Sequence, residues 1–239
     1  MIVELPVAIG PTGGDPPAGL NADHPMRAVT RAVAFDEAGW TPERRAEVAA
    51  LFDGLAPEWH TRDAPGRLDA LRDALDRGLV EAPPAPRSVA LDIGAGTGLF
   101  TEVLVGRFDT VLAVDLACEM LRHHPGAGAH RVQADAAVLP VPDGSVDVLV
   151  LVNAFLFPAE VHRILAPAGA VVWVSSRGSD TPIHLPATDV DAAATAGNAA
   201  LRAEYGDRLP VVLLDGEEHS YWEIDEPRLR DDLRSATGT

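Results

Sequence analysis

The chain has 239 residues, of which 47% are hydrophobic, and a formal net charge of −17 at pH 7. This acidity argues against a nucleic-acid partner, because proteins bind the phosphate backbone through a basic surface. No stretch approaches the ~18 uninterrupted apolar residues of a transmembrane helix, and no basic region precedes an apolar one at the N-terminus. We therefore expect no membrane partner and a cytoplasmic location.

The first third of the chain predicts an irregular segment followed by two helices. Residues 1–40 hold many glycines and prolines, which predict an irregular N-terminal lead. A threonine, a proline and a glutamate then mark the start of a helix over 41–55. Leucines at helical spacing predict another helix over 65–79. Trp59 and His60 lie between these two helices, where both helices can position them.

A glycine-rich turn forms the centre of the chain. Residues 89–93 are an apolar run that predicts a buried strand of a parallel sheet. Gly94, Gly96 and Gly98 follow at alternate positions, and an apolar stripe over 99–105 predicts a helix. Glycine takes positive φ angles and lets a ligand approach bare backbone. This stretch is therefore the first half of a βαβ unit with a ligand-binding turn.

A second apolar run, over 110–115, predicts the next strand and ends in Asp115. An acid about 20 residues beyond the first glycine is placed to accept hydrogen bonds from ribose hydroxyls. A dinucleotide fingerprint needs Gly or Ala three positions after Gly96, but Leu99 stands there. We therefore expect a ligand that carries a ribose but is not a dinucleotide.

The pattern from Asp92 to Gly98, with Asp115 downstream, resembles the first two motifs of class I S-adenosylmethionine-dependent methyltransferases. The resemblance covers about 41–187 and implies a Rossmann-like, doubly wound α/β fold with a mostly parallel sheet. It also implies S-adenosylmethionine (SAM) as cofactor and, with the acidity, a small-molecule methyl acceptor. The implied cofactor contacts come from the glycine turn and from strand ends: Asp92, Gly94, Ala95, Gly96, Gly98, Asp115, Leu116, Met120, Asp135, Ala136 and Asn153.

Some of these contacts have defined roles by the same resemblance. The glycine turn lies under the methionine part of SAM, Asp115 holds the ribose and Leu116 packs on the adenine. Asp135, followed by a small residue, reaches the adenine amino group. Asn153 follows a predicted strand over 146–152. It either touches cofactor or substrate or, as an equal alternative, caps the next helix.

The resemblance also suggests a role for the first helices, which in this family often cover the cofactor. Trp59 and His60 then line the site, and His60 is a candidate base for a hydroxyl or amine acceptor. The alternative is that Trp59 packs between the helices and His60 is solvated. A methyl group on a sulfonium is already activated, so alignment and desolvation are the main requirements. No metal site is expected, since the neighbouring His123 and His124 point to different faces of a helix.

The C-terminal segment departs from this family. Residues 209–214 and 220–224 predict strands around an Asp-Gly turn, an antiparallel hairpin that would close the sheet. Residues of about 199–235 also resemble the C-terminal half of a glutaredoxin-like, thioredoxin-fold domain without its Cys-x-x-Cys. Since Cys118 is the single cysteine, dithiol redox chemistry is excluded.

Two functions follow from this organisation. The chain divides into the lead, a methyltransferase domain at 41–187 and an atypical C-terminal segment at 188–239. The first function is an active SAM-dependent methyltransferase. The alternative is a SAM-binding but catalytically impaired fusion or remnant protein, in which the atypical segment replaces the closing strands of the sheet.

Overall fold

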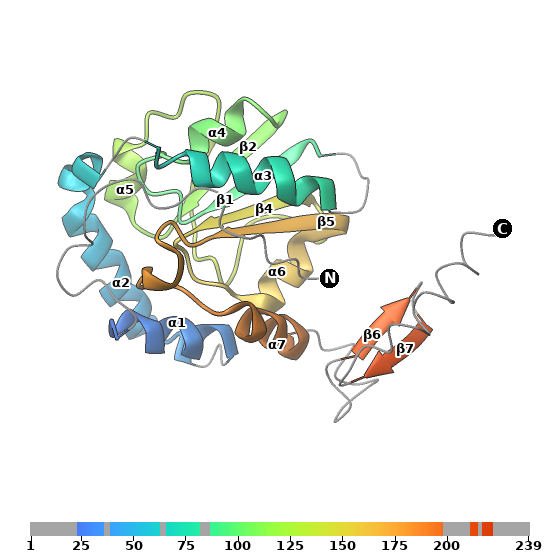
Figure 1. The fold of residues 1–239 in the computed structure, drawn as a ribbon. Coiled ribbons are helices and arrows are strands. Elements are labelled where there is room, and N and C mark those ends of the chain that lie inside the picture. The colour runs from blue at the N-terminus through green and yellow to red at the C-terminus, as the bar shows by residue number, and fades with distance from the viewer. Residues whose placement is uncertain are drawn as a thin grey trace.

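A five-stranded parallel sheet forms the centre of the computed structural model, with strand order β3-β2-β1-β4-β5 (Figure 1). The structure describes residues 23–35, 39–62, 66–81, 87–197, 211–214 and 217–221. The sheet strands are β1 (Val89–Ile93), β2 (Thr110–Asp115), β3 (His130–Gln133), β4 (Val146–Val152) and β5 (Leu165–Val174). The order in which the chain adds strands reverses beside β1: β2 and β3 lie on one side of β1, and β4 and β5 lie on the other. The carboxyl ends of β1, β2 and β4 therefore border the expected ligand crevice.

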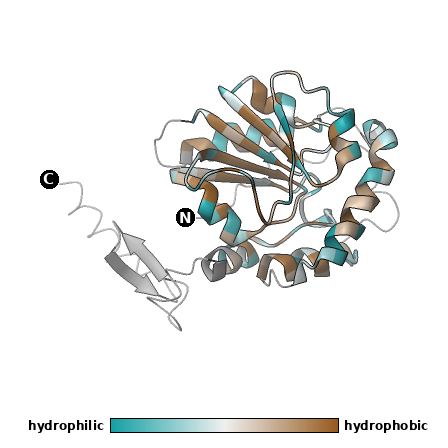
Figure 2. Ribbon diagram, turned by 180° about the vertical axis from the view of Figure 1, so that it is seen from behind, coloured by the Kyte–Doolittle hydropathy of each residue, from teal (hydrophilic) through white to brown (hydrophobic). Residues whose placement is uncertain are grey.

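Helices cover both faces of this sheet (Figure 1). They are α1 (Met26–Phe35), α2 (Pro42–Leu55), η2 (Ala56–Arg62), α3 (Asp69–Glu81), α4 (Thr101–Val105), α5 (Cys118–His123), α6 (Pro158–Ile164), η3 (Gly178–Asp180) and α7 (Ala187–Gly197). Adjacent β1 residues serve opposite faces, since Ala90 packs with Leu71 of α3 and Leu91 packs with Ile164 of α6. Strands buried on both faces are apolar almost throughout, and Figure 2 shows the sheet strands predominantly brown.

The predicted irregular lead contains a helix. Helix α1 lies inside it and packs Ala34 against Leu185 and Ala193 near the C-terminal end of the domain. The glycines and prolines that suggested irregular chain lie mostly in 1–22, outside the described residues. Averaging composition over the whole lead concealed the short helix at its end.

The C-terminal hairpin forms, but it does not join the sheet. Strands β6 (Val211–Leu214) and β7 (Glu217–Tyr221) pair antiparallel as a separate two-stranded sheet. The five-stranded sheet is parallel throughout, so the predicted closing hairpin is not supported, and β7 begins earlier than predicted. An Asp-Gly turn is a local signal that brings two strands together, and it carries no information about which third strand they meet.

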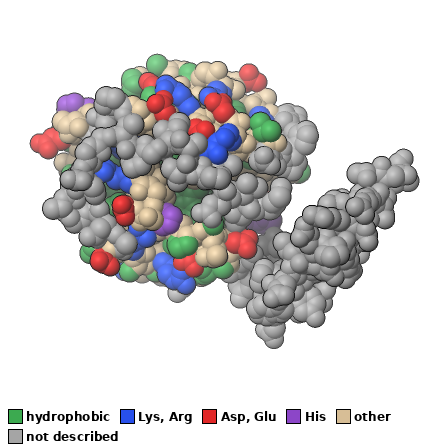
Figure 3. Space-filling model, viewed as in Figure 1, with side chains coloured by type: hydrophobic (Ala, Val, Ile, Leu, Met, Phe, Trp, Pro, Cys, Tyr) green, Lys and Arg blue, Asp and Glu red, His purple; other side chains and the backbone are tan. Residues whose placement is uncertain are grey.

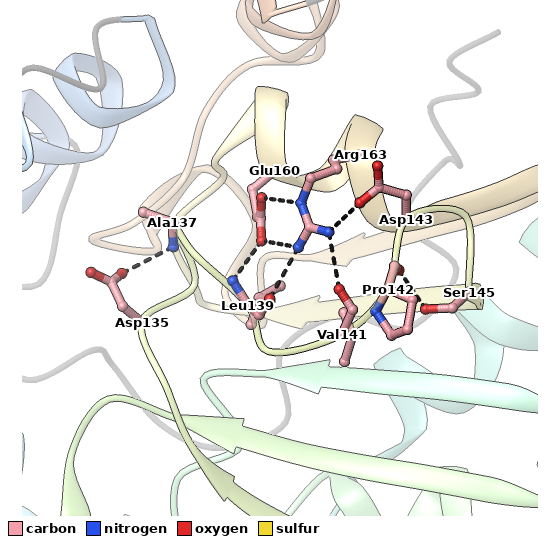
Figure 4. Close-up of polar contacts among 9 residues, drawn as sticks. All are labelled: Asp135, Ala137, Leu139, Val141, Pro142, Asp143, Ser145, Glu160 and Arg163. Atoms are coloured by element: carbon pink, nitrogen blue, oxygen red, sulfur yellow. Dashed lines mark hydrogen bonds and ion pairs between the residues drawn. The ribbon is translucent and has the colours of Figure 1, made fainter.

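Arg163 of α6 fastens the loop between β3 and β4 (Figure 4). Its guanidinium donates to the Glu160 carboxylate at 2.7 and 2.8 Å, to Asp143 at 2.6 Å, and to the carbonyls of Val141 and Leu139 at 3.0 Å. Hydrogen bonds from Arg163 lower the pKa of Glu160. All five guanidinium donors are used here, which makes Arg163 a structural residue.

A backbone strain lies in the first half of β5, and relieving it should stabilise the domain. Ala168 has a φ of +60°, the left-handed region that glycine tolerates better. We expect Ala168→Gly to raise the free energy of unfolding by about 0.5–1 kcal/mol. This value is the free energy that a left-handed backbone costs alanine, minus the entropic cost of fixing the more flexible glycine in the folded state. Gly169→Ala should do the opposite, because its Cβ would lie 2.8 Å from the Ala166 carbonyl oxygen. Urea denaturation measures both; a less stable Ala168→Gly protein contradicts the strain.

Candidate functional site

The glycine turn after β1 has the predicted backbone. Gly94, Gly96 and Gly98 have φ angles of +69°, +57° and +84°, all in the left-handed region. The Gly96 N–H donates to Asp115 Oδ2 at 2.8 Å, so the turn is tied to the end of β2. Ala95, between two of these glycines, is buried. The turn therefore presents backbone without side chains at the carboxyl edge of the sheet.

Asp115 joins the turn to the next helix. Its Oδ2 accepts the Gly96 N–H and its Oδ1 accepts the Ala117 N–H, each at 2.8 Å. Burial raises the pKa of this carboxyl, while the backbone hydrogen bonds oppose that rise. A carboxylate has about four acceptor positions. Each oxygen thus keeps capacity for a further donor, as a pair of ribose hydroxyls requires.

Asp92 is a second acid at the turn and, unlike the half-buried Asp115, it is fully buried. It is 2% exposed, and its Oδ2 accepts the Thr101 hydroxyl at 2.6 Å. Burial, with repulsion from Asp115 as a smaller cause, raises the pKa of Asp92 to about 6. Within the part of the chain that the structure describes, no Arg or His forms a salt bridge with either acid. The glycine-turn end of the site therefore carries two acids that no Arg or His of the described residues neutralises in a salt bridge.

The N-terminal helices reach the turn through Trp59. A Cβ on Gly96 would lie 3.7 Å from Trp59 Nε1 and 3.9 Å from the sulfur of Met120, which is itself buried. Trp59 also packs edge to face on Phe52 of α2. Trp59 therefore packs on the first of the two predicted helices and lies beside Gly96, and its place in the cofactor site stays a prediction. His60 is exposed on η2, as the solvated alternative expects, and its role as a base stays a prediction.

Asp135, the expected adenine contact, is held by the N-terminal segment. Trp40 Nε1 donates to its two oxygens at 3.0 and 3.2 Å, and Arg45 donates to Oδ2 at 2.9 Å. The Ala137 N–H donates to Oδ1 at 3.0 Å. These contacts occupy the carboxylate, so an adenine amino group would have to displace one of them. Ala136 and Leu116, the other residues expected near the adenine, are half-buried.

Trp40 and Arg45 are site residues that sequence reasoning missed. Trp40 also packs edge to face on Phe155 and Phe157, which follow β4, with ring centroids 5.5 and 5.4 Å away. It thus bridges the ends of two strands at the ligand edge. The two residues lie 95 and 90 positions from Asp135, and no local pattern reports a contact across that separation.

Asn153 connects the ends of β4 and β5. Its backbone is left-handed, with a φ of +52°. Its Oδ1 accepts the Ser176 N–H and its Nδ2 donates to Ser176 Oγ, each at 2.9 Å. The alternative that Asn153 caps the next helix is wrong, because Phe157 is the N-cap of α6. Its predicted contact with cofactor or substrate stays a prediction, and the structure places it at the right edge of the sheet.

The described residues lack two features. None of their helices has the length and apolar character needed to cross a membrane. Their His, Cys, Asp and Glu side chains form no group of three or more placed to hold a metal ion.

Comparison with known proteins identifies two families along the chain. A methyltransferase-domain family matches residues 91–173, and a glutaredoxin-like-domain family matches 172–234. The second match begins in β5, upstream of the predicted start near 199. It confirms the resemblance, and the matched range contains no cysteine.

Three similar proteins illustrate how much of the chain such matches cover. An uncharacterized protein of Mycobacterium tuberculosis is 50% identical over 81 residues, 31% of this chain and 84% of that protein. A malonyl-[acyl-carrier protein] O-methyltransferase of Methylococcus capsulatus is 38% identical over 153 residues, 56% of this chain. The present chain spans only about half, 52%, of that enzyme. Among solved structures, a DhpI complex with S-adenosylhomocysteine (SAH) has a TM-score of 0.42 at 25% identity, over 52% of this chain and 64% of DhpI.

The matched ranges assign a family to each part of the chain. The methyltransferase match contains the glycine turn, Asp92, Asp115 and Asn153. Residues 91–173 therefore form a methyltransferase domain of the family that uses S-adenosylmethionine, and the chain continues into a glutaredoxin-like segment.

Proposed function

We propose that the chain is a SAM-dependent methyltransferase acting on a small-molecule acceptor. The observation that carries this proposal is a pair of acids that border the glycine turn, the buried Asp92 and the half-buried Asp115, neither of which forms a salt bridge with a basic side chain of the described residues. A buried charge is stable when an opposite charge neutralises it. SAM brings a sulfonium and an ammonium group to this position. The pyrophosphate of a dinucleotide would instead meet two carboxylates, which disfavours NAD.

The remaining contacts follow the strand ends. Asp115 has acceptor capacity for two ribose hydroxyls, and Leu116 follows it directly. Met120 and Trp59 border the turn at Gly96 and form an apolar wall beside the methionine part. We propose that Asp135 receives the adenine amino group after one of its present donors has moved aside.

Methyl transfer from SAM requires no covalent intermediate with the protein. Bound SAM supplies a methyl group that its sulfonium already activates. The protein's own residues align the acceptor and exclude water around it, and the N-terminal helices are placed to do both. For a hydroxyl or amine acceptor, His60 is the proposed base that takes the proton, although its exposure requires the acceptor to lie at the rim of the site.

The acceptor class is a finer proposal. The relative from M. capsulatus is named as an O-methyltransferase, so we propose an oxygen acceptor. On the face drawn in Figure 3, Arg side chains are interspersed with acidic ones over the described part of the surface. With a net charge of −17, this distribution supports a small molecule in preference to a nucleic acid.

The test separates binding from transfer. Calorimetry with SAM, SAH and NAD should show binding of the first two and no binding of NAD; NAD binding in place of SAM would overturn the proposal. Incubation with methyl-labelled SAM and a fractionated metabolite extract should then transfer label to a small molecule. The alternative, an impaired SAM-binding protein, is favoured by the separate hairpin and by the glutaredoxin-like match in place of closing strands. That alternative predicts binding without any labelled product.

Binding should depend on pH through Asp92. Because SAM favours the charged carboxylate, its affinity should fall as the pH drops below about 6. The ligand-free protein should show the opposite trend. The pKa of Asp92 is higher in the folded than in the unfolded chain, so its contribution to stability is full at low pH and is lost as the pH rises through about 6. Asp92→Asn should flatten both profiles, measured by calorimetry and by urea denaturation; unchanged profiles would exclude Asp92 as the titrating group.

A further inference from the structure

A buried histidine outside the predicted site is linked to Asp92. The Gly126 N–H donates to His124 Nδ1 at 2.9 Å, so the proton of the neutral ring is on Nε2. His124 Nε2 lies 3.2 Å from Thr101 Oγ1, and that hydroxyl lies 2.6 Å from Asp92 Oδ2. The hydrogen bonds therefore run in one direction, from the imidazole through the hydroxyl to the carboxylate.

The surroundings fix this direction. His124, Thr101 and Asp92 are 4%, 1% and 2% exposed. A second ring proton would sit on Nδ1 and face the Gly126 N–H. Burial first, and the Arg131 guanidinium second, lower the pKa of His124. Arg131 donates to the His124 carbonyl oxygen at 3.1 Å, and Asp115 is the other charged group that acts on Asp92. The ring is therefore a neutral donor.

The same ring abuts the glycine turn. A Cβ on Gly98 would lie 2.6 Å from His124 Nε2 and 2.7–2.8 Å from two ring carbons. Since Gly98 has a φ of +84°, the backbone passes the ring at a point where no side chain fits. His124 thus contacts the third glycine of the turn and, through Thr101, the acid before its first glycine.

We propose that His124 is a positioning residue for the cofactor, which together with Thr101 holds the Asp92 carboxylate and the glycine turn in the arrangement that receives the cationic end of SAM. This inference rests on the proposed function. His124 donates to Thr101, and Thr101 donates to Asp92. This order keeps Asp92 a hydrogen-bond acceptor in its charged form, which a cation needs. His124 itself lies below the turn and acts through Thr101.

Two substitutions of His124 test the two ring nitrogens separately. In His124→Gln the amide N–H replaces Nε2 and the donor to Thr101 is kept. In His124→Asn the amide oxygen replaces Nδ1 and that donor is lost. SAM affinity is measured by calorimetry between pH 5 and 8, and His123→Asn is the matched control, since His123 is the adjacent exposed histidine.

We expect His124→Asn to bind SAM about tenfold more weakly at pH 7, the upper value for one hydrogen bond between neutral groups, here the imidazole and the Thr101 hydroxyl. The pH midpoint of binding should also move upward, because the Thr101 hydroxyl that donates to Asp92 loses its own donor and then stabilises the carboxylate charge less. His124→Gln and His123→Asn should stay near wild type. A general loosening of the fold would not move the midpoint.

Each other result overturns the inference. Wild-type affinity and midpoint in His124→Asn exclude the linkage, and equal losses in both His124 variants assign the ring to packing alone. If the wild-type protein does not bind SAM, the proposed function fails, and this inference with it; binding with an unaffected His124→Asn removes the inference only. Should His124→Asn not fold, Thr101→Val and Thr101→Ser give the same contrast, since serine restores the hydroxyl that valine lacks.

Discussion

Replacing Asp115 by asparagine is expected to lower SAM affinity by about one to two orders of magnitude. Both carboxylate oxygens accept a backbone N–H, from Gly96 and from Ala117. Asparagine has one oxygen, so its NH₂ group would face one of these donors and leave it unpaired, which lowers the stability of the protein by about 1–3 kcal/mol with or without SAM. Loss of the charged acceptor for the ribose costs about 1.5–3 kcal/mol of binding free energy. This second loss corresponds to about 10- to 150-fold in SAM affinity.

Calorimetry with SAM measures this effect, and Asp109→Asn is its control. Asp109 is exposed in the loop just before β2, so its substitution makes the same change in net charge without touching the turn. Its SAM affinity should match that of the wild-type protein. If Asp115→Asn binds SAM as tightly as the control does, Asp115 is only a structural acceptor and the ribose is held elsewhere.

The central strands and the glycine turn were predictable because their signals are local. The predicted strands over 89–93, 110–115 and 146–152 coincide with β1, β2 and β4. A strand covered on both faces must be apolar throughout, so its ends are marked in the sequence. The positive φ angles of the turn were predictable because glycine is the residue that adopts them without steric cost, and three glycines alternate directly after a predicted strand.

The contacts that shape the site were not predictable in this way. Trp40 and Arg45 reach Asp135 across most of the domain, and Asn153 bonds a residue beyond the next strand. In the sequence, the adjacent His123 and His124 indicate only a poor metal site. The hydrogen-bond partner of His124, Thr101, lies 23 positions away. Helical and strand periodicity locate a residue on a face, but they do not identify the side chain that it meets.

Helix α1 and the C-terminal hairpin illustrate the same limit at the level of whole elements. Helix α1 packs on α7, more than 150 positions along the chain, so composition near α1 says nothing of that contact. The β6–β7 pair forms from its own turn signal, yet it stands as a separate sheet. Local signals predicted the hairpin but not helix α1, and only the tertiary arrangement decides the neighbours of either element.

A second large effect is expected at the last glycine of the turn. Gly98→Ala places a Cβ in a left-handed backbone, which costs about 1–2 kcal/mol. The same Cβ would lie 2.6 Å from His124 Nε2, in space that the imidazole ring already occupies. Overpacking of this kind costs about 1–3 kcal/mol more. We therefore expect the free energy of unfolding to fall by about 2–5 kcal/mol.

Gly144→Ala provides the matched control for the backbone term. Gly144 has a φ of +61°, and a Cβ there would meet nothing within 4 Å. Urea denaturation of the two variants should therefore differ by the overpacking term alone. A double-mutant cycle assigns that term to one contact: with His124→Ala in the background, Gly98→Ala should cost no more than Gly144→Ala does. If Gly98→Ala costs the same with and without the imidazole, the ring does not support the turn, and the link from His124 to the cofactor site would have to run through Thr101 alone.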